Sequence, residues 1–270
     1  GTPNHKVKVM TDDGPVWRRL DALEPGDSMI VKLGQHAGRS QALSRPLRQH
    51  GNQVMPDFPR ALDEEFAFFL GYMAGDGFVA RGSSDHRIGV TVAHSSYLMR
   101  EMPVLIRRLF GEHITIHTLQ KPDDASVTFA LDNRAVKDFL LLNGLDKTSS
   151  ATVGVPRLIR QSPPEIVGAY LRGLFEADGA LSHHYPQLMS SSRRLIDEVA
   201  SLLIGLGCPV RISQQPESVD RYGTQTVWAL RIQSFYGLQN WKTWVGCDPE
   251  SRFAPCLDFQ PDLTRETAYP

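Results

Sequence analysis

Apolar residues along the chain follow a pattern of helices and strands that occurs twice. Residues 62–75 and 163–177 are predominantly apolar, and each segment predicts a buried helix. Each helix is expected to end at an Asp-Gly pair, the first beginning with Asp76 and the second with Asp178. The two aspartates lie about 100 positions apart, which is too long a period for a solenoid and suits a duplicated domain.

The segments that follow each apolar helix also match. In the first half they predict a strand over 87–93, a helix over 96–110, strands over 114–119 and 126–131, and a helix over 133–144. In the second half they predict a strand over 187–191, a helix over 193–207, strands over 210–213 and 227–234, and a helix over 237–246. The strands alternate apolar and polar residues, which is typical of a sheet with one covered and one solvated face.

The remaining segments differ in pattern and divide the chain. Residues 1–33 predict short strands separated by turns, and residues 34–60 are rich in Gln, His, Arg and Pro and predict a linker. The expected organisation is a β segment over 1–33, a linker over 34–60, a first repeat over 61–160, a second repeat over 161–254 and a tail over 255–270.

Composition narrows the class of protein. Hydrophobic residues make up 41% and charged residues 22%, which disfavours disorder and a coiled coil. No stretch approaches the roughly 18 apolar residues of a membrane span, and no secretory signal is seen, so a cytoplasmic protein without a membrane partner is expected. Three cysteines without a CxxC pair disfavour a disulfide framework and a cysteine-rich zinc site. With a net charge of −1, any charge that attracts nucleic acid must be local to one face.

Both apolar helices carry small residues four positions apart. These residues are Gly71, Gly75, Gly173 and Ala177. Residues at this spacing share one helical face and allow two backbones to approach closely. We therefore expect the two helices to pack on each other about a pseudo-twofold axis, with the Asp76 and Asp178 carboxylates within a few Å. One apolar helix ending in Asp-Gly is most often structural, but two matched occurrences favour a functional pair that a divalent cation neutralises.

At these residues the chain resembles a known family. FLGYMAGDG (69–77) and LRGLFEADG (171–179) resemble the paired motifs of the LAGLIDADG homing endonucleases, in the single-chain, two-motif form found in inteins. The resemblance covers roughly residues 60–254 and implies an α+β fold. It implies two αββαββα repeats, packed through the motif helices about a pseudo-twofold axis, whose sheets form a saddle for double-stranded DNA. A monomer with internal pseudo-symmetry follows.

The N-terminal segment resembles part of an intein splicing domain. Thr2 to His5 resembles its threonine–histidine motif, and Leu23 to Asp27 resembles the lead-in to one of its strands. An upstream nucleophile segment and a terminal His-Asn pair are missing. Thr2 and His5 are therefore interpreted as relics of a splicing motif, and splicing is expected only with complementary intein fragments.

The family resemblance assigns the metal site. It implies that Asp76 and Asp178 bind divalent metal together with the backbone carbonyls of Gly75 and Ala177. Magnesium suits carboxylate and carbonyl oxygens, and Mn²⁺ or Ca²⁺ can occupy such a site. The metal would activate a water and stabilise the leaving oxygen of a phosphodiester, with one acid serving each strand.

One departure from the family pattern concerns the basic residue of the catalytic pocket. A lysine is expected two residues before an Ile/Val-Pro pair, but TVGVP (152–156) places Val153 there. Lys147 is the remaining candidate in the first half. In the second half the candidate is Arg252, with Lys242 as the weaker choice. Reduced or one-strand cleavage is therefore an open outcome.

The solvated faces of the predicted strands carry the residues expected to bind DNA. They are Arg87, Thr91, Thr115, His117, Thr128, Arg211, Ser213, Arg231 and Gln233. A two-stranded ribbon fits the major groove, where the base pairs are distinguishable. His183 and His184 are interpreted as an exposed turn, and Trp241 as a core residue.

Three functions stay open at this point. The first is a site-specific, metal-dependent DNA endonuclease. The second is a protein of the same fold with impaired or absent cleavage: a nickase, a DNA-binding regulator or an RNA maturase. The third is an intein fragment that needs a partner chain.

Overall fold

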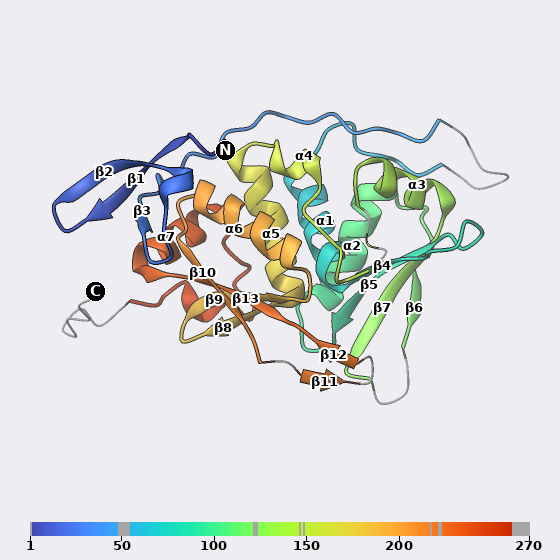
Figure 1. The fold of residues 1–270 in the computed structure, drawn as a ribbon. Helices are drawn as coiled ribbons and strands as arrows, with labels where there is room; N and C mark the ends of the chain where they lie inside the picture. Colours follow the sequence, from blue (N-terminus) through green and yellow to red (C-terminus); the bar gives the residue numbers. More distant parts are fainter. Residues whose placement is uncertain are drawn as a thin grey trace.

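The two apolar motif segments form the central helices of the molecule. They are α1 (Glu64–Asp76) and α5 (Pro164–Asp178), and they run side by side through the middle of the structure (Figure 1). The structure is a computed structural model that describes residues 2–47, 55–120, 124–145, 147, 149–216, 218–220 and 223–260. Helices form one layer and two antiparallel sheets form the other, as predicted for an α+β fold.

Each motif helix opens one repeat of the same order of elements. In the first repeat α1 is followed by β4 (Gly77–Val79), β5 (Arg87–Ala93), α2 (Leu98–Phe110), β6 (His117–Leu119), β7 (Ser126–Asp132) and α3 (Arg134–Leu142). After the short α4 (Arg157–Arg160), α5 is followed by β8 (Gly179–Ser182), β9 (Tyr185–Ser190), α6 (Arg193–Gly205), β10 (Val210–Gln214), β11 (Ser218–Asp220), β12 (Gly223–Gln225), β13 (Trp228–Ile232) and α7 (Ser234–Trp244). The strand orders β4-β5-β7-β6 and β8-β9-β13-β10 are equivalent, which confirms the predicted two-repeat arrangement.

Local signals in the sequence explain where the helices begin. The side chain of Asp63 accepts a hydrogen bond from the Phe66 amide at 2.8 Å and caps α1. Asn133 caps α3 and Ser192 caps α6 in the same way. Each cap satisfies an amide that the helix itself cannot pair, so these three helices start where the sequence provides an acceptor.

One hydrophobic core runs through both repeats. Phe66 and Leu70 of α1 and Tyr170 and Leu174 of α5 are fully buried. The sheets contribute to the same core the strand residues that face the helices, such as Leu188. The motif helices are therefore covered by both sheets and by each other, and the two repeats share one continuous hydrophobic core.

Several strands differ from the predicted ones. The strand predicted over 114–119 is limited to β6, so Thr115 lies outside it, although it is exposed. The sequence pattern missed β4 and β8, which directly follow the Asp-Gly pairs and consist of three or four residues. Strands this short carry too little alternation to be read from sequence. The hairpin β11–β12 was also missed, and no counterpart to it lies between β6 and β7 in the described part of the first repeat.

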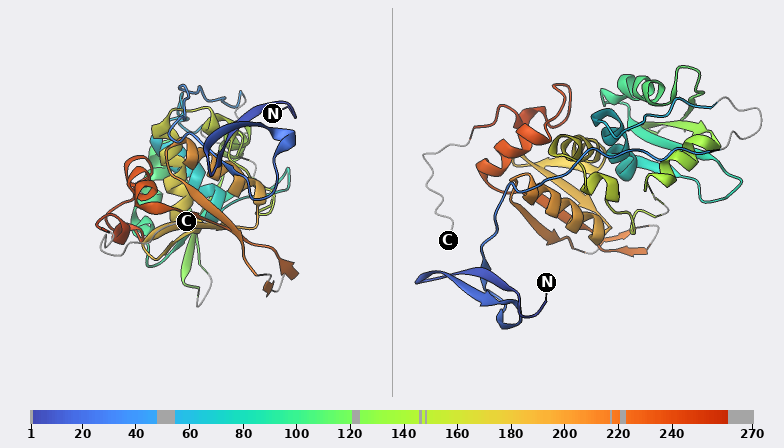
Figure 2. Two further views of the ribbon diagram at one scale, coloured as in Figure 1. Left: turned by 60° about the vertical axis from the view of Figure 1, so that its left-hand side comes forward. Right: turned by 90° about the horizontal axis from the view of Figure 1, so that it is seen from above.

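The N-terminal segment forms a small sheet of its own. Its strands β1 (Lys6–Thr11), β2 (Gly14–Arg19) and β3 (Ser28–Met29) pair in the order β2-β1-β3. Val9 is its one buried hydrophobic residue, whereas Trp17 and Val31 are 65% and 56% exposed. The sheet projects from the rest of the molecule (Figure 2, right).

Between β3 and α1 the described chain is irregular. Its residues, 30–47 and 55–63, are called the strap here, and they run along both repeats (Figure 1). The Gly34 amide donates to the Ile204 carbonyl at 3.1 Å, in the second repeat. Farther along, the Ser44 amide donates to the Asn143 side chain at 2.9 Å, in the first repeat. The strap therefore braces the two repeats on the helical side of the molecule.

All three cysteines are free. Within the described residues, no helix combines the length and the apolar character needed to cross a bilayer.

Candidate metal and nucleic-acid site

The backbones of the two motif helices touch at their glycines. A Cβ built on Gly71 would lie well under 3.0 Å from the Tyr170 carbonyl oxygen, and one built on Gly173 equally close to the Phe68 carbonyl oxygen. A Cβ built on Gly75 would likewise overlap the Cβ of Ala177. The four small residues expected at this interface therefore lie at the points of closest approach.

This packing brings the two motif aspartates to one place. Asp76 and Asp178 are the last residues of α1 and α5, whose C-terminal ends lie together. A Cβ on Gly75 would lie 3.2 Å from Oδ2 of Asp178, so the Asp178 carboxylate rests against the first motif. Burial, reinforced by the charge of Asp76, raises the pKa of Asp178 to about 6. Asp76 itself keeps more solvent contact.

Two basic side chains reach the same point from opposite repeats. The Lys147 ammonium donates to the carbonyl of Gly75. The Arg252 guanidinium donates to the carbonyl of Glu176 and, at 3.0 Å, to that of Ala177. Burial lowers the pKa of Lys147, while Asp178 and Asp76 oppose this effect. Two cations therefore face two carboxylates, in an arrangement that follows the pseudo-symmetry of the repeats.

The other basic candidates lie elsewhere. Val153 is a buried core residue whose carbonyl accepts a hydrogen bond from the Ser192 hydroxyl at 2.7 Å. Lys242 approaches the carbonyl of Phe259 at 3.5 Å and is not among the residues around the aspartates. In this structure Lys147 and Arg252 take the positions near the motif carbonyls.

The structure adds three residues to this site that the sequence analysis did not single out: Tyr72, Tyr97 and Glu176. Tyr72 and Glu176 line a cavity of about 170 Å³ together with Asp76, Tyr97 and Arg252. The Tyr72 hydroxyl donates to the carbonyl of Thr91 at 3.0 Å and so ties α1 to β5. Glu176 is 5% exposed, and its Oε1 has no hydrogen-bond partner. The only available signal was its acidic character inside an otherwise apolar motif.

The donor set fits a hard divalent cation. It combines the carboxylates of Asp76 and Asp178 with the carbonyls of Gly75 and Ala177, all of them oxygen donors. Among the described residues, no group of three or more His, Cys, Asp or Glu side chains could hold a metal. A site of two carboxylates leaves several positions for water and phosphate oxygens, which is how Mg²⁺ usually binds. Lys147 and Arg252 donate to these same carbonyls in this structure.

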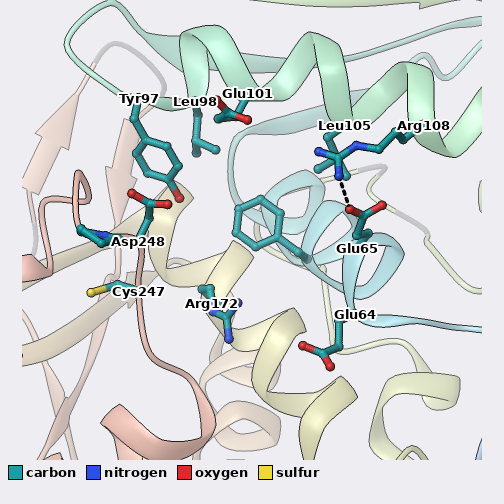
Figure 3. A pocket seen from close by; sticks show the side chains of 12 residues that line it. Glu64, Glu65, Tyr97, Leu98, Glu101, Leu105, Arg108, Arg172, Cys247 and Asp248 are labelled. Atoms are coloured by element: carbon teal, nitrogen blue, oxygen red, sulfur yellow. Dashed lines mark hydrogen bonds and ion pairs between the residues drawn. The ribbon is translucent and has the colours of Figure 1, made fainter. Parts of the chain in front are cut away.

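A larger cavity of about 490 Å³ lies between α1, α2 and α5 (Figure 3). Its walls carry Glu64, Glu101 and Asp248, and Glu65 forms an ion pair with Arg108 at 2.5 Å. Arg172 donates to the carbonyl of Val245 at 2.6 Å. This excess of acidic groups repels phosphate, so the cavity is not a candidate for nucleic acid.

The residues expected to bind DNA lie on strands of both sheets, except Thr115, which precedes β6, and Gln233, which follows β13 and precedes α7. Exposed residues are Arg87, Thr115, His117, Arg211 and Ser213, and half-buried ones are Thr91, Thr128, Arg231 and Gln233. Arg87 is already paired with Asp85 at 2.7 Å, and the Thr91 and Thr128 hydroxyls contact each other at 2.9 Å. Thr2 and His5 lie in the separate N-terminal segment and take no part in this surface.

The raised pKa of Asp178 predicts a pH dependence of stability. Because the folded protein holds this proton more tightly than the unfolded chain, the group contributes most below its ordinary pKa near 4, and the contribution is lost as the pH rises through 6. Allowing for partial solvent contact, the loss should be roughly 2 kcal/mol. Urea unfolding of the metal-free protein and of Asp178→Asn at pH 4 and pH 7 checks this. Asp178→Asn should lack this component, and equal pH dependence in both proteins would contradict the assignment.

Comparison with known proteins adds a family match for the second repeat. Residues 165–242 match the model of the LAGLIDADG-like domain. This range begins in α5 and ends in α7, so the match lies within the second repeat.

Curated relatives match over most of the chain at low identity. The replicative DNA helicase DnaB of Synechocystis sp. (strain ATCC 27184 / PCC 6803 / Kazusa) is 28% identical over 254 residues, covering 87% of this chain and 26% of that protein. The ribonucleoside-diphosphate reductase NrdEB subunit alpha of Bacillus subtilis (strain 168) is 22% identical, covering 75% of this chain and 18% of that protein. The replication factor C small subunit of Methanocaldococcus jannaschii is 22% identical, and the match covers 74% of this chain and 10% of that protein. The chain thus spans between a tenth and about a quarter of these relatives.

Solved structures of homing endonucleases resemble the chain weakly. A mesophilic variant of I-DmoI has a TM-score of 0.49 and 17% identity, covering 67% of this chain and 95% of that one. I-WcaI bound to its DNA recognition sequence has a TM-score of 0.44 and 10% identity, and the match covers 71% of this chain and 86% of that one.

Proposed function

We propose that the protein is a site-specific DNA endonuclease that hydrolyses phosphodiester bonds with a divalent metal, Mg²⁺ by preference. The observation that carries this proposal is the meeting of Asp76 and Asp178 at the ends of two touching helices, each repeat adding one basic side chain. The match of residues 165–242 to the LAGLIDADG-like domain supports it. The chain would act as a monomer, because its two repeats already supply both acids, and the proposed location is the cytoplasm.

The side chains of this site have separable tasks. Asp76 and Asp178, with the carbonyls of Gly75 and Ala177, would hold the metal. The metal supplies an activated water and charge stabilisation at the leaving oxygen. Lys147 and Arg252 would bind the negatively charged phosphate once they leave the motif carbonyls. Each repeat thus brings one acid and one cation to its own strand of the duplex.

The surface beside this site suits a duplex. The sheets carry Arg211 and Arg231 among short polar side chains, and side chains of this kind both contact phosphates and read base edges. The net charge of −1 does not favour DNA binding, but the positive charges of Arg211 and Arg231 on this face do.

Cleavage selection tests the proposal. The protein is incubated with a library of duplexes in Mg²⁺ and, separately, in EDTA, and the ends are sequenced. We expect Mg²⁺-dependent breaks within one long site. Nicks on one strand would indicate one impaired half, and specific retention without breaks would contradict the endonuclease.

A DNA-binding protein without cleavage is the second candidate. It is favoured by Val153, which stands where a pocket lysine is expected, and by the occupation of both motif carbonyls by Lys147 and Arg252. If the library shows binding alone, the selection is repeated with Mn²⁺ in place of Mg²⁺, and specific binding without breaks in both metals would support this second candidate.

The chain is also proposed to be a segment embedded in larger host proteins, in the manner of an intein. Three curated relatives with unrelated names share it over a minor part of their length, which supports an inserted element. The N-terminal sheet, with its exposed Trp17 and Val31, would then be completed by other intein fragments. Mixing the protein with candidate fragments and searching for ligated product tests this role.

A further inference from the structure

The short strand β4 places an aromatic side chain beside the paired aspartates. β4 is an edge strand of its sheet and begins directly after Asp76, so the Cα atoms of Asp76 and Phe78 lie within about 7 Å of each other. Phe78 stands in register with Gly89 of β5. It has no part in the metal site or in the set of strand residues expected to bind DNA.

The Phe78 ring lies on the face of the sheet that is turned away from the helices. Val79, the next residue of β4, is buried in the core, and so are Ile88 and Val90 of β5. Because side chains alternate along a strand, Phe78 projects to the opposite face, which also carries Thr91. This is the face expected to meet DNA.

Gly89 makes room for the ring on this face. A Cβ built on Gly89 would lie 2.6 Å from Cε1 and 3.1 Å from Cζ of Phe78, so the ring occupies the space in which a side chain of β5 would stand. Phe78 is thereby held half-buried over the backbone of β5. The part of the ring that stays open to solvent is an apolar surface next to the proposed metal site.

Four positions in register form a row across this outer face in each repeat. In the first repeat the row consists of Phe78, Gly89, Ala130 and His117. In the second repeat the row consists of Ala180, Gln187, Arg231 and Arg211. The rows correspond, because each begins two residues after a motif aspartate and crosses equivalent strands. The first row is apolar except at its far end, whereas the second carries one amide and two guanidinium groups.

The two rows suit different base edges. In the major groove, guanine and adenine present acceptors that Arg and Gln side chains can pair with, and thymine is the base that presents an apolar group, its 5-methyl group. The first three members of the apolar row carry no side-chain donor, acceptor or charge, so they can bind neither a polar base edge nor a phosphate. The complement of this row is therefore the methyl group of thymine.

We propose that Phe78 is a specificity-determining residue that contacts the 5-methyl group of a thymine near the centre of the DNA target. The contact is confined to the half bound by the first repeat, because Ala180 at the equivalent position is too short to make it. The target is then asymmetric although the two repeats share one fold. This inference rests on the proposed function, but it requires only sequence-specific binding and not cleavage.

The first experiment selects duplexes by binding. A library of randomised duplexes is captured by the full chain in EDTA, so that recovery does not depend on cleavage, and the bound duplexes are sequenced. The wild type should enrich thymine at one position near the centre of the recovered site, and Phe78→Ala should lose this preference. Tyr236→Ala, which removes an exposed aromatic side chain of α7 outside both sheets, should keep it.

The outcomes of this selection separate the inference from the proposed function. A specific site without such a thymine would overturn the role of Phe78 and leave specific DNA binding standing. The same result follows if Phe78→Ala keeps the full thymine preference. Recovery of no specific site would refute both.

The second experiment isolates the methyl group and needs no variant. Binding of the recovered site to the wild type is compared with binding of the same duplex that carries uracil at the selected position. Loss of the one methyl group should weaken binding about 3- to 5-fold. In a duplex with cytosine at this position, 5-methylation of that cytosine should strengthen binding by a similar factor.

Phe78→Ala should bind the thymine and uracil duplexes equally. Equal affinity of the wild-type protein for these two duplexes would overturn the proposal. Because the wild-type comparison changes only the DNA, it decides the question even if Phe78→Ala does not fold.

Discussion

The Asp178→Asn protein should bind its duplex target and leave it uncut. The substitution removes one of the two carboxylates that would hold the metal, so the rate of double-strand cleavage should fall about 10²- to 10³-fold or more. The corresponding Asp76→Asn change should have the same effect, because the two acids occupy equivalent helix ends. Cleavage assays in Mg²⁺ that separate nicked from linear product measure the loss.

Binding assays distinguish this outcome from misfolding. Removing a negative charge from the centre of the duplex-binding surface should leave affinity unchanged or slightly higher. Asp197→Asn is the matched control, because Asp197 is an exposed acid on α6 that forms an ion pair with Arg193 at 2.9 Å. If either motif variant cut at the wild-type rate, the shared metal site would be wrong.

The Gly71→Ala protein should be strongly destabilised. The added Cβ would collide with the Tyr170 carbonyl, and a backbone atom cannot move aside as a flexible side chain can. Separating the helices would disturb the whole core, so we expect a loss of about 3 kcal/mol or more, against a gain of about 1 kcal/mol from helix propensity. Gly173→Ala meets the Phe68 carbonyl and should behave alike.

Urea unfolding measures this effect. Ser201→Ala on the exposed side of α6 is the control and should stay within about 0.5 kcal/mol of the wild type. Because the same contact positions Asp76 and Asp178, any folded Gly71→Ala protein should also cleave more slowly. A wild-type unfolding midpoint in Gly71→Ala would show that the helices do not touch at this glycine.

The two largest expected effects share one cause. The glycines allow the helices to approach, and this approach buries Asp178 and places it near Asp76; burial first, and the charge of Asp76 second, raise the pKa of Asp178. A cation opposes this shift. Stability without metal and activity with metal should therefore respond in opposite directions to the loss of Asp178.

Much of the architecture was determined by the sequence alone. The apolar runs over 62–75 and 163–177 place the central helices, and the recurring order of elements after Asp76 and Asp178 determines the duplication. These features depend on periodicity and on helix signals that are local in the chain, so they can be read without a structure. The small residues at Gly71 and Gly173 identify the faces that meet.

Other features were decided only by the tertiary structure. Lys147 lies six residues before the position where a pocket lysine was expected, and the path of its loop alone brings it to Gly75. The sequence named Arg252 and, as the weaker choice, Lys242, and only the packing shows that Arg252 reaches the motif carbonyl. Glu176 is left partly unsatisfied by burial that no local pattern reveals. The absence of an ion pair at Arg231 among the described residues likewise depends on which side chains neighbouring segments bring within reach. Sequence periodicity records which face a residue takes, whereas charge pairing and desolvation depend on distances between segments that are far apart in the chain.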